Sequence, residues 1–265
     1  MMSIIKVLLI LLIAYLIICG LIYLVQEKFI FFPEKLSKEY RFVFRQAFEE
    51  INIEMEDGDI LNALLFKADS SKGLIFYLHG NAGSIRSWGE VAETYTDMNY
   101  DLFMPDYRGY GKSDGRIRNE SQLYNDIKTV YDHIKSRYAE DKIIILGYSL
   151  GTGLATRLAS SSQSRLLILQ APFFSLIDMK KHYFPFIPTF ILKYKFETNS
   201  YIRQCKMPVV IFHGDKDEII YYGSSLKLKE LIKETDTLIT LKGQQHNGMS
   251  GNIQYLEAFE KIITE

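Results

Sequence analysis

The residues best suited to chemistry are a serine flanked by glycines and two polar residues far downstream of it. Residues 147–151 spell GYSLG with Ser149 at the centre, and Asp217 and His246 follow later in the chain. A serine hydroxyl is a weak nucleophile near neutral pH, so it needs a base that removes its proton and an acid that orients the base. These residue types predict nucleophilic catalysis, with Ser149 as nucleophile, His246 as general base and Asp217 as the orienting acid.

Each of these residues follows a predicted strand. The apolar segment KIIIL precedes the serine, and a predicted helix from Leu150 to Ser160 follows it. A glycine-flanked serine between a strand and a helix lies on a strained turn that lifts its hydroxyl clear of the sheet. Asp217 comes shortly after the apolar segment PVVIF, and His246 lies in a glycine-bounded loop after TLITL. All three candidate catalytic residues therefore lie after the ends of predicted strands.

Other side chains compete for two of these roles. Asp215 lies only two residues before Asp217, and its alternative role is that of a turn residue bonding its own backbone. We favour Asp217 because of the triad geometry expected after that strand. His133 falls in a predicted helix and His213 at a strand end, so both are predicted to be structural rather than basic groups in catalysis.

A glycine-containing loop could supply hydrogen-bond donors for an oxyanion. Residues 79–83, HGNAG, follow the apolar segment GLIFYL. Acyl transfer needs backbone N–H groups aimed at the developing negative charge, and we assign this role to the N–H groups of Asn81 and Leu150. The alternative is a simple turn. A nucleotide-binding loop is not indicated, because neither G-x-G-x-x-G nor G-x-x-x-x-G-K-[ST] occurs here.

The elements that must position these residues are predicted from hydrophobic patterning. From residue 73 onward, short wholly apolar segments alternate with longer helical ones, which indicates an α/β fold with a mostly parallel central sheet and helices on both faces. A helix is expected from Ser121 to Tyr138, with Ser121 as its N-cap. In residues 51–68, apolar and polar side chains alternate on either side of Asp57-Gly58, which predicts an antiparallel hairpin at one edge of the sheet.

An aromatic-rich insertion interrupts this alternation. Residues 172–204 contain three prolines and many aromatic side chains. Connections of this length in a compact domain usually have a function, so we expect a small helical lid. The alternative is that the aromatic side chains only complete the core.

The first residues predict a transmembrane helix. No charge occurs from Val7 to Val25, and such a helix would be roughly 28 Å long, close to the thickness of the bilayer core. We expect an uncleaved single-pass anchor over residues 1–27 and a catalytic domain over residues 28–265. The alternative is a cleaved signal peptide, although the segment is long for one and no A-x-A-like site follows. Basic residues after the segment favour a cytoplasmic domain, an exported domain is the other possibility, and the sequence leaves the side of the membrane open.

Composition and charge limit the classes of partner that we expect for this chain. The chain has 265 residues, a net charge of −1 and a pI near 6.5, so it lacks the basic surface that nucleic acids require. The histidines and the two cysteines, Cys19 and Cys205, have no metal-ligand spacing, and the cysteines are too far apart in the predicted elements to pair. We expect no metal and no cofactor, and the predicted partners are a membrane and a small-molecule or acyl-chain substrate.

With these residues placed, the chain resembles the α/β-hydrolase superfamily, in particular its membrane-anchored serine hydrolases related to dienelactone hydrolase. The resemblance extends from Phe29 to the C-terminus and includes DYRGYGKS at 106–113, APFFSL at 171–176 and YFPFIP at 183–188. The order Ser, Asp, His is the one this fold uses. The resemblance implies a cofactor-free esterase or thioesterase, and some relatives remove fatty acyl groups from proteins. Dienelactone hydrolases proper use cysteine, and the serine here favours ordinary acyl esters.

Two other functions remain open. Prolyl-type peptidases share the triad order, but the chain has no room for their propeller-sized extra domain. A non-catalytic, membrane-tethered binding protein would usually have lost a triad residue, and none is lost here. The sequence favours hydrolysis of an ester or thioester.

Overall fold

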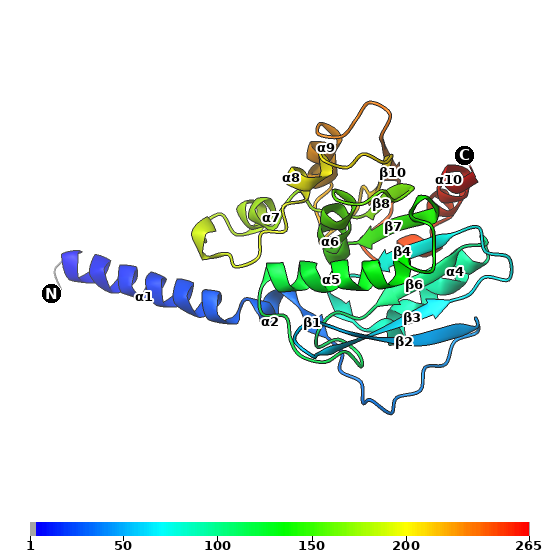
Figure 1. Cartoon of the computed structure of the whole chain (residues 1–265). Coiled ribbons are helices and arrows are strands. Elements are labelled where there is room, and N and C mark those ends of the chain that lie inside the picture. The colour runs from blue at the N-terminus through cyan, green and yellow to red at the C-terminus, as the bar shows by residue number, and fades with distance from the viewer. Residues whose placement is uncertain (1–3, 265) are drawn as a thin grey trace.

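An eight-stranded sheet forms the centre of this computed structural model, which describes residues 4–264 (Figure 1). The strand order is β10-β9-β8-β7-β4-β6-β3-β2. The strands are β2 Phe48–Glu54, β3 Ile60–Phe66, β4 Leu74–Leu78, β6 Asp101–Pro105, β7 Ile143–Tyr148, β8 Leu166–Gln170, β9 Val209–Gly214 and β10 Thr237–Leu241. A separate parallel pair joins β1 Phe32–Pro33 to β5 Ala82–Gly83.

The six strands from β10 to β6 are parallel, and β3 pairs antiparallel with both β6 and the edge strand β2. Every residue of β4, β6, β7, β8 and β9 is buried, as the continuous apolar segments predicted. The hairpin of β2 and β3 is confirmed at the edge of the sheet, and its turn contains Gly58 at φ +84°.

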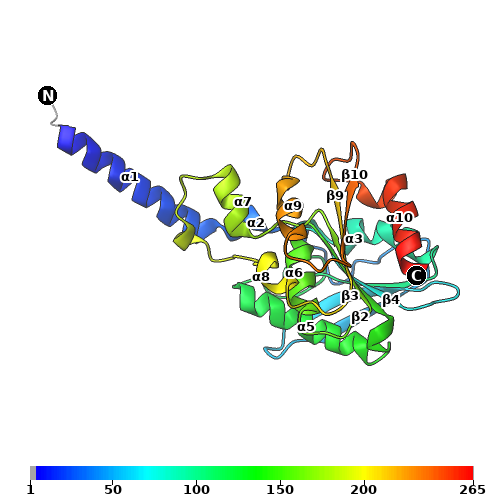
Figure 2. The ribbon, with the colours of Figure 1, turned by 90° about the horizontal axis from the view of Figure 1, so that it is seen from above.

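Helices cover both faces of the sheet (Figure 2). Buried side chains of α5 and α6 share one core cluster with Leu228 of α9, and the opposite cluster includes Tyr95 of α4 and Phe259 of α10. The predicted α/β-hydrolase architecture is thereby confirmed. The helices of the two layers are α3 Ile85–Trp88, α4 Ala92–Thr96, α5 Glu120–Lys135, α6 Leu150–Ala159, α9 Gly223–Lys229 and α10 Ile253–Thr264, with 3₁₀ turns at Gly89–Val91, Glu140–Lys142 and Met249–Gly251.

The predicted start of the helix at Ser121 is wrong. α5 begins at Glu120, and its N-cap is Asn119, whose side-chain oxygen accepts the backbone N–H of Gln122 at 2.8 Å. Asn119 has the extended backbone that an N-cap requires. The helix also ends at Lys135, three residues before the predicted end. Serine and asparagine are both good caps, so composition alone did not distinguish the two positions.

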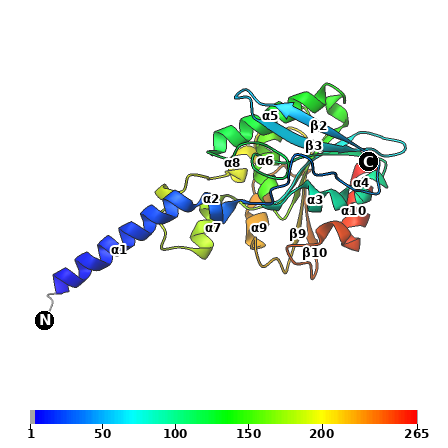
Figure 3. The ribbon, with the colours of Figure 1, turned by 90° about the horizontal axis from the view of Figure 1, so that it is seen from below.

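The N-terminal helix and the insertion stand apart from these layers. α1 spans Ile4–Val25, is long and apolar enough to cross a membrane, and is almost wholly exposed; a signal sequence has the same properties. α2, Glu27–Ile30, follows it. The insertion between β8 and β9 contains α7 Leu176–Tyr183, a 3₁₀ turn at Thr189–Ile191 and α8 Thr198–Ile202. Figure 3 shows α1 projecting from the domain, with the insertion beside its base.

Candidate active site

Ser149 lies on a sharp turn between β7 and α6. Its backbone has φ 50° and ψ −115°, a conformation that L-residues rarely adopt, and its N–H donates to the carbonyl of Gln170 at 2.9 Å. Strain of this kind persists only where the surrounding structure imposes it. Here the strand β7 ends and the helix α6 begins on either side of the serine, and this raises the hydroxyl at the carboxyl edge of the sheet.

The two flanking glycines make this turn possible. A Cβ at Gly151 would lie 1.9 Å from the carbonyl oxygen of Leu78, and one at Gly147 would lie 2.5 Å from the carbonyl oxygen of Gly151. Both distances are far shorter than van der Waals contact allows. The G-x-S-x-G pattern is therefore required by the close approach of α6 to the strands below it.

The structure brings Ser149, His246 and Asp217 together, although 97 residues separate the first two. His246 Nε2 lies 3.0 Å from Ser149 Oγ, and His246 Nδ1 lies 2.7 Å from Asp217 Oδ2. With the Nδ1 proton donated to the carboxylate, Nε2 is free to accept the serine proton. All three side chains are buried. The arrangement has the connectivity of a nucleophile, a base and an orienting acid.

The carboxylate of Asp217 is held on both oxygens. Oδ1 accepts the backbone N–H groups of Ile219 and Ile220, at 2.9 and 2.8 Å. Oδ2 faces two imidazoles, with His213 Nε2 at 3.2 Å in addition to His246. Burial acts to raise the pKa of Asp217, but the hydrogen bonds of His213 and His246 outweigh it and hold that pKa well below its ordinary value. The group is therefore an anion throughout the neutral range.

The competing candidates have other roles. Asp215 Oδ1 accepts the backbone N–H of Gly243 at 2.7 Å, which ties its turn to the loop that carries His246. His133 lies exposed in the last turn of α5, away from this group. His213 is completely buried at the end of β9, with Nδ1 2.6 Å from Ser225 Oγ. Its contact with Asp217 was missed by the sequence analysis, although their spacing of four residues was visible.

The loop of residues 79–83 lies beside the serine. The N–H of Leu150 is the first of α6 and has no acceptor within its helix. The carbonyl of Asn81, on the peptide that follows its N–H, accepts the Phe32 N–H at 2.9 Å and the Tyr110 hydroxyl at 2.8 Å, which fixes this residue in the loop. The Tyr107 hydroxyl donates to the carbonyl of His79 at 2.7 Å. The sequence analysis singled out the DYRGYG segment without a role, and here its two tyrosines hold this loop in place.

Two further contacts position the loop of His246. The hydroxyl of Tyr148, the residue before the nucleophile, donates to the carbonyl of His246. The backbone N–H of His246 donates to Glu218 Oε2 at 3.3 Å. Neither residue was assigned a role from sequence, because each contact joins segments that only the fold brings together.

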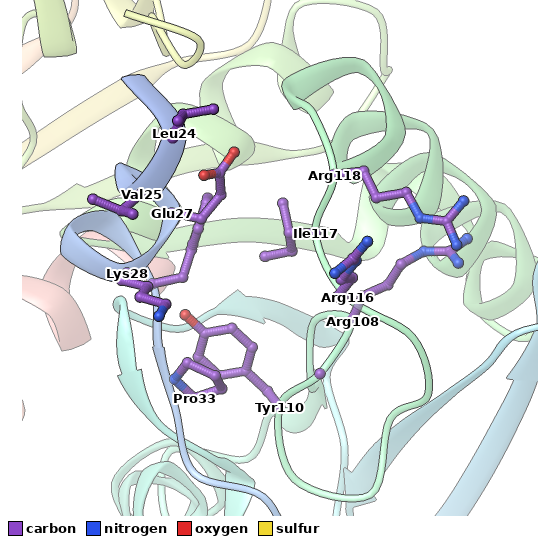
Figure 4. A pocket seen from close by; sticks show the side chains of 12 residues that line it. Leu24, Val25, Glu27, Lys28, Pro33, Arg108, Tyr110, Arg116, Ile117 and Arg118 are labelled. Atoms are coloured by element: carbon purple, nitrogen blue, oxygen red, sulfur yellow. The ribbon is translucent and has the colours of Figure 1, made fainter. Parts of the chain in front are cut away.

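A cavity of about 590 Å³ lies at the base of α1, away from the three candidates (Figure 4). It is lined by the end of α1, by α2 and by residues 108–118. Arg108 lines it but is engaged by carboxylates, with both Asp126 oxygens at 2.7 and 2.9 Å. Within residues 4–264 no group of three or more histidine, cysteine, aspartate or glutamate side chains is placed to hold a metal ion.

The sequence of this chain is similar to those of a known protein family. The model of the family described as serine aminopeptidase, S33, matches residues 69–202, about half of the chain. Alpha/beta hydrolase domain-containing protein 17B of Xenopus tropicalis is 30% identical over 208 residues, which cover 74% of this chain and 68% of that protein. The human protein 17C is 29% identical over 203 residues, covering 74% and 60% of the two chains.

Solved structures with less similar sequences share the fold. An esterase of Pyrococcus furiosus superposes with a TM-score of 0.68 at 19% identity, covering 88% of this chain and 98% of the esterase. Est1E of Butyrivibrio proteoclasticus, solved with ferulic acid, gives a TM-score of 0.61 at 21% identity, covering 80% and 96%. At these identities the likeness establishes the architecture alone.

Proposed function

This chain belongs to the α/β-hydrolase superfamily, in the family of the S33 model and of the alpha/beta hydrolase domain-containing proteins 17, and we propose that it cleaves a carboxylic ester or thioester through an acyl-enzyme. The observation that carries the proposal is the pair of contacts of His246, 3.0 Å to Ser149 and 2.7 Å to Asp217. It is supported by the strained backbone of Ser149, which presents the hydroxyl on a turn between a strand and a helix.

The reaction follows from these contacts. Ser149 Oγ attacks the substrate carbonyl carbon while His246 Nε2 takes the hydroxyl proton, and the imidazolium that forms is stabilised by Asp217. The N–H groups of Asn81 and Leu150 bind the oxyanion. The carbon–oxygen or carbon–sulfur bond then breaks, and His246 gives its proton to the leaving alcohol or thiol. His246 next deprotonates a water, which attacks the carbonyl carbon of the acyl-enzyme. The bond from that carbon to Ser149 Oγ then breaks, His246 returns the proton to Oγ, and the acid leaves.

The substrate class is proposed to be lipid or acyl-protein. Ser149 and His246 are buried, and we assign the insertion that follows β8, residues 172–204, as a lid over them. α1 is assigned as a membrane anchor within residues 1–27, followed by a catalytic domain over 28–265. A lidded site beside an apolar helix suits a substrate that partitions into the bilayer. The relation to dienelactone hydrolases stays a prediction from the sequence.

A fluorophosphonate probe and an ester panel test this function. The probe should label the wild-type protein, and peptide mapping should place the adduct on Ser149. Esters and thioesters of increasing acyl length should then show turnover that rises toward long chains. Absence of labelling in folded protein would contradict the mechanism, and a maximum at acetate would contradict the lipid-like substrate while leaving the mechanism intact.

A second candidate is peptide hydrolysis, which the description of the family model as serine aminopeptidase favours. The same triad would cleave an amide, with His246 protonating a leaving amine. Peptide anilides distinguish the two, because efficient anilide turnover with poor ester turnover would favour the peptidase. A non-catalytic binding role would be favoured instead if a Ser149→Ala variant complemented the wild type in cells.

A further inference from the structure

The apolar helix α1 contacts the tip of the insertion, which we define as residues 183–192. The Tyr15 hydroxyl donates to the carbonyl oxygen of Phe186 at 2.9 Å, although 171 residues separate them. At the base of α1, Gln26 Nε2 donates to the carbonyl of Ile191 at 3.0 Å, and Gln26 Oε1 accepts the N–H of Lys193 at 2.8 Å. Figures 1 and 3 show the segment lying alongside α1. The insertion tip and the helix are therefore held side by side.

This contact places the tip at a definite depth if α1 crosses a bilayer. Tyr15 lies ten residues before Val25, the last residue of α1, which corresponds to about 15 Å along a helix. The hydrocarbon core is about 30 Å thick. Phe186 would then lie well inside the hydrocarbon rather than at its surface.

The side chains of the tip match that environment. No residue from Tyr183 to Leu192 carries a charge. Phe184, Phe186 and Phe190 are 60, 87 and 86% exposed, unlike the aromatic side chains of the two cores. Exposed clusters of large apolar side chains mark surfaces that bind another apolar phase. Lysines border the tip on both sides: Lys180 and Lys181 precede it, and Lys193, which pairs with Glu27 at 3.0 Å, follows it.

The backbone of the tip satisfies part of its own hydrogen-bonding capacity, whereas the N–H groups of Phe186, Thr189 and Phe190 have no acceptor within the described residues. A segment in hydrocarbon must satisfy its own polar groups. Pro185 and Pro188 have no N–H to satisfy. The N–H groups of Ile187, Ile191 and Leu192 donate to carbonyls within the tip, at 3.1, 3.4 and 3.2 Å. Tyr15 supplies the donor for the carbonyl of Phe186.

Charges at the base of α1 agree with this placement. Lys28, Arg116 and Arg118 line the cavity of Figure 4 together with Leu24 and Val25, where α1 ends. Cationic side chains at the end of an apolar helix lie at the level of lipid phosphates. Glu27 lines the same cavity, so the charges at the level of the headgroups are mixed with an excess of cations, and the tip is apolar where acyl chains would be.

We infer that residues 183–192 insert into the same leaflet from which α1 emerges, so that the insertion is a second membrane-embedded element. The inference rests on the proposed anchor. It gives the insertion a physical connection between bilayer and site: the His182 ring stacks on Tyr221 with centroids 3.9 Å apart, and Tyr221 follows the turn that carries Asp217.

Depth-dependent fluorescence quenching in nanodiscs tests the insertion. The full chain with Phe186→Cys is labelled with NBD and reconstituted with phosphatidylcholine carrying doxyl groups on the acyl chain. Ile253→Cys is the matched control, because Ile253 is 71% exposed at the start of α10, on the side of the domain away from α1. The native thiols are buried, and burial raises the pKa of Cys205 to about 12, so background labelling should be low.

The label at 186 should show blue-shifted emission that doxyl lipid quenches, and the label at 253 should show neither. Equal, weak quenching at both positions would overturn the inference. A blue shift at 186 without lipid quenching would also overturn it, because a protein partner would then cover the tip.

An activity measurement separates this inference from the proposed function. The double variant Phe186→Ser with Phe190→Ser should keep its turnover of a soluble short-chain ester. Its turnover of a long-chain ester embedded in nanodiscs should fall about tenfold or more, because the apolar contact with acyl chains is lost. If wild-type protein hydrolysed neither ester while the label at 186 was still quenched, the proposed function would fail and the insertion would stand.

Discussion

His213 Nε2 lies 3.2 Å from Asp217 Oδ2, the same carboxylate oxygen that His246 contacts, so the candidate acid faces a second imidazole besides the catalytic one. The same His213 nitrogen is 2.9 Å from the carbonyl of Ile220, and its other nitrogen is 2.6 Å from Ser225 Oγ. A neutral ring that accepts from Ser225 and donates from Nε2 satisfies all of these contacts. His213 is thus placed to position Asp217 without touching a substrate.

Replacing His213 should slow the chemical step. A hydrogen bond to a charged group contributes about 1.5–3 kcal/mol, which corresponds to roughly a ten- to hundredfold fall in kcat for His213→Ala. His213→Gln keeps a donor near the Nε2 position and should recover most of that loss. Steady-state kinetics at fixed pH measures both. Equal losses in the two variants, with matching losses in Tm, would indicate a purely structural role.

Removing the nucleophile should abolish labelling and nearly all turnover. Ser149→Ala is expected to lower kcat/KM by about 10⁴-fold or more, because nothing else at the site can form the acyl-enzyme. Its thermal stability should remain close to that of the wild type, since the substitution removes one oxygen atom. Ser70→Ala, in an exposed loop, is the control and should change neither quantity.

The two aspartates of the β9 turn should behave differently. Asp217→Asn is expected to lower kcat by about 10⁴-fold, because an amide favours the wrong tautomer of His246. Asp215→Asn should keep activity within about tenfold, since Asp215 only ties the turn to Gly243 and such a hydrogen bond contributes about 1 kcal/mol. Kinetics of the two variants, measured side by side, checks the assignment. A larger loss for Asp215→Asn would reverse it.

Acid should remove part of the stability that Asp217 provides. Because its pKa is lowered in the folded state, the stabilisation is fully present above the unfolded value of about 3.9 and is lost as pH falls toward the folded value. Unfolding free energies of the wild type should therefore fall more steeply below about pH 5 than those of Asp217→Asn. Denaturant titrations between neutral pH and pH 3 measure the difference. Parallel curves for the two proteins would contradict it.

The glycine after the nucleophile should not tolerate a methyl group. Gly151→Ala would place its Cβ 1.9 Å from the Leu78 carbonyl, so α6 must shift away from β4. We expect a loss of at least about 1–3 kcal/mol of stability and loss of fluorophosphonate labelling. Gly251→Ala meets nothing within 4 Å and should change stability by less than about 1 kcal/mol. Equal effects of the two substitutions would contradict the packing argument.

The sequence by itself determined the architecture and the candidate residues. Continuous apolar segments specify buried parallel strands wherever they occur, and Gly147 and Gly151 indicate a turn because no other residue fits so close to a neighbouring backbone. The order of Ser149, Asp217 and His246 could be taken directly from the chain. These are local properties, set by residue type and by distance along the sequence.

Only the tertiary structure decided which distant groups meet. The contact of Asp217 with His246, the second imidazole at Asp217 and the tyrosines that hold the Asn81 loop all depend on where loops from different strands converge. Likewise, aromatic residues at 183–190 could have completed a core, and their exposure beside Tyr15 follows from how the insertion leaves β8. The physical reason is common to all of these cases: a contact between segments separated by tens of residues is selected by packing, and hydrophobic pattern carries no information about it.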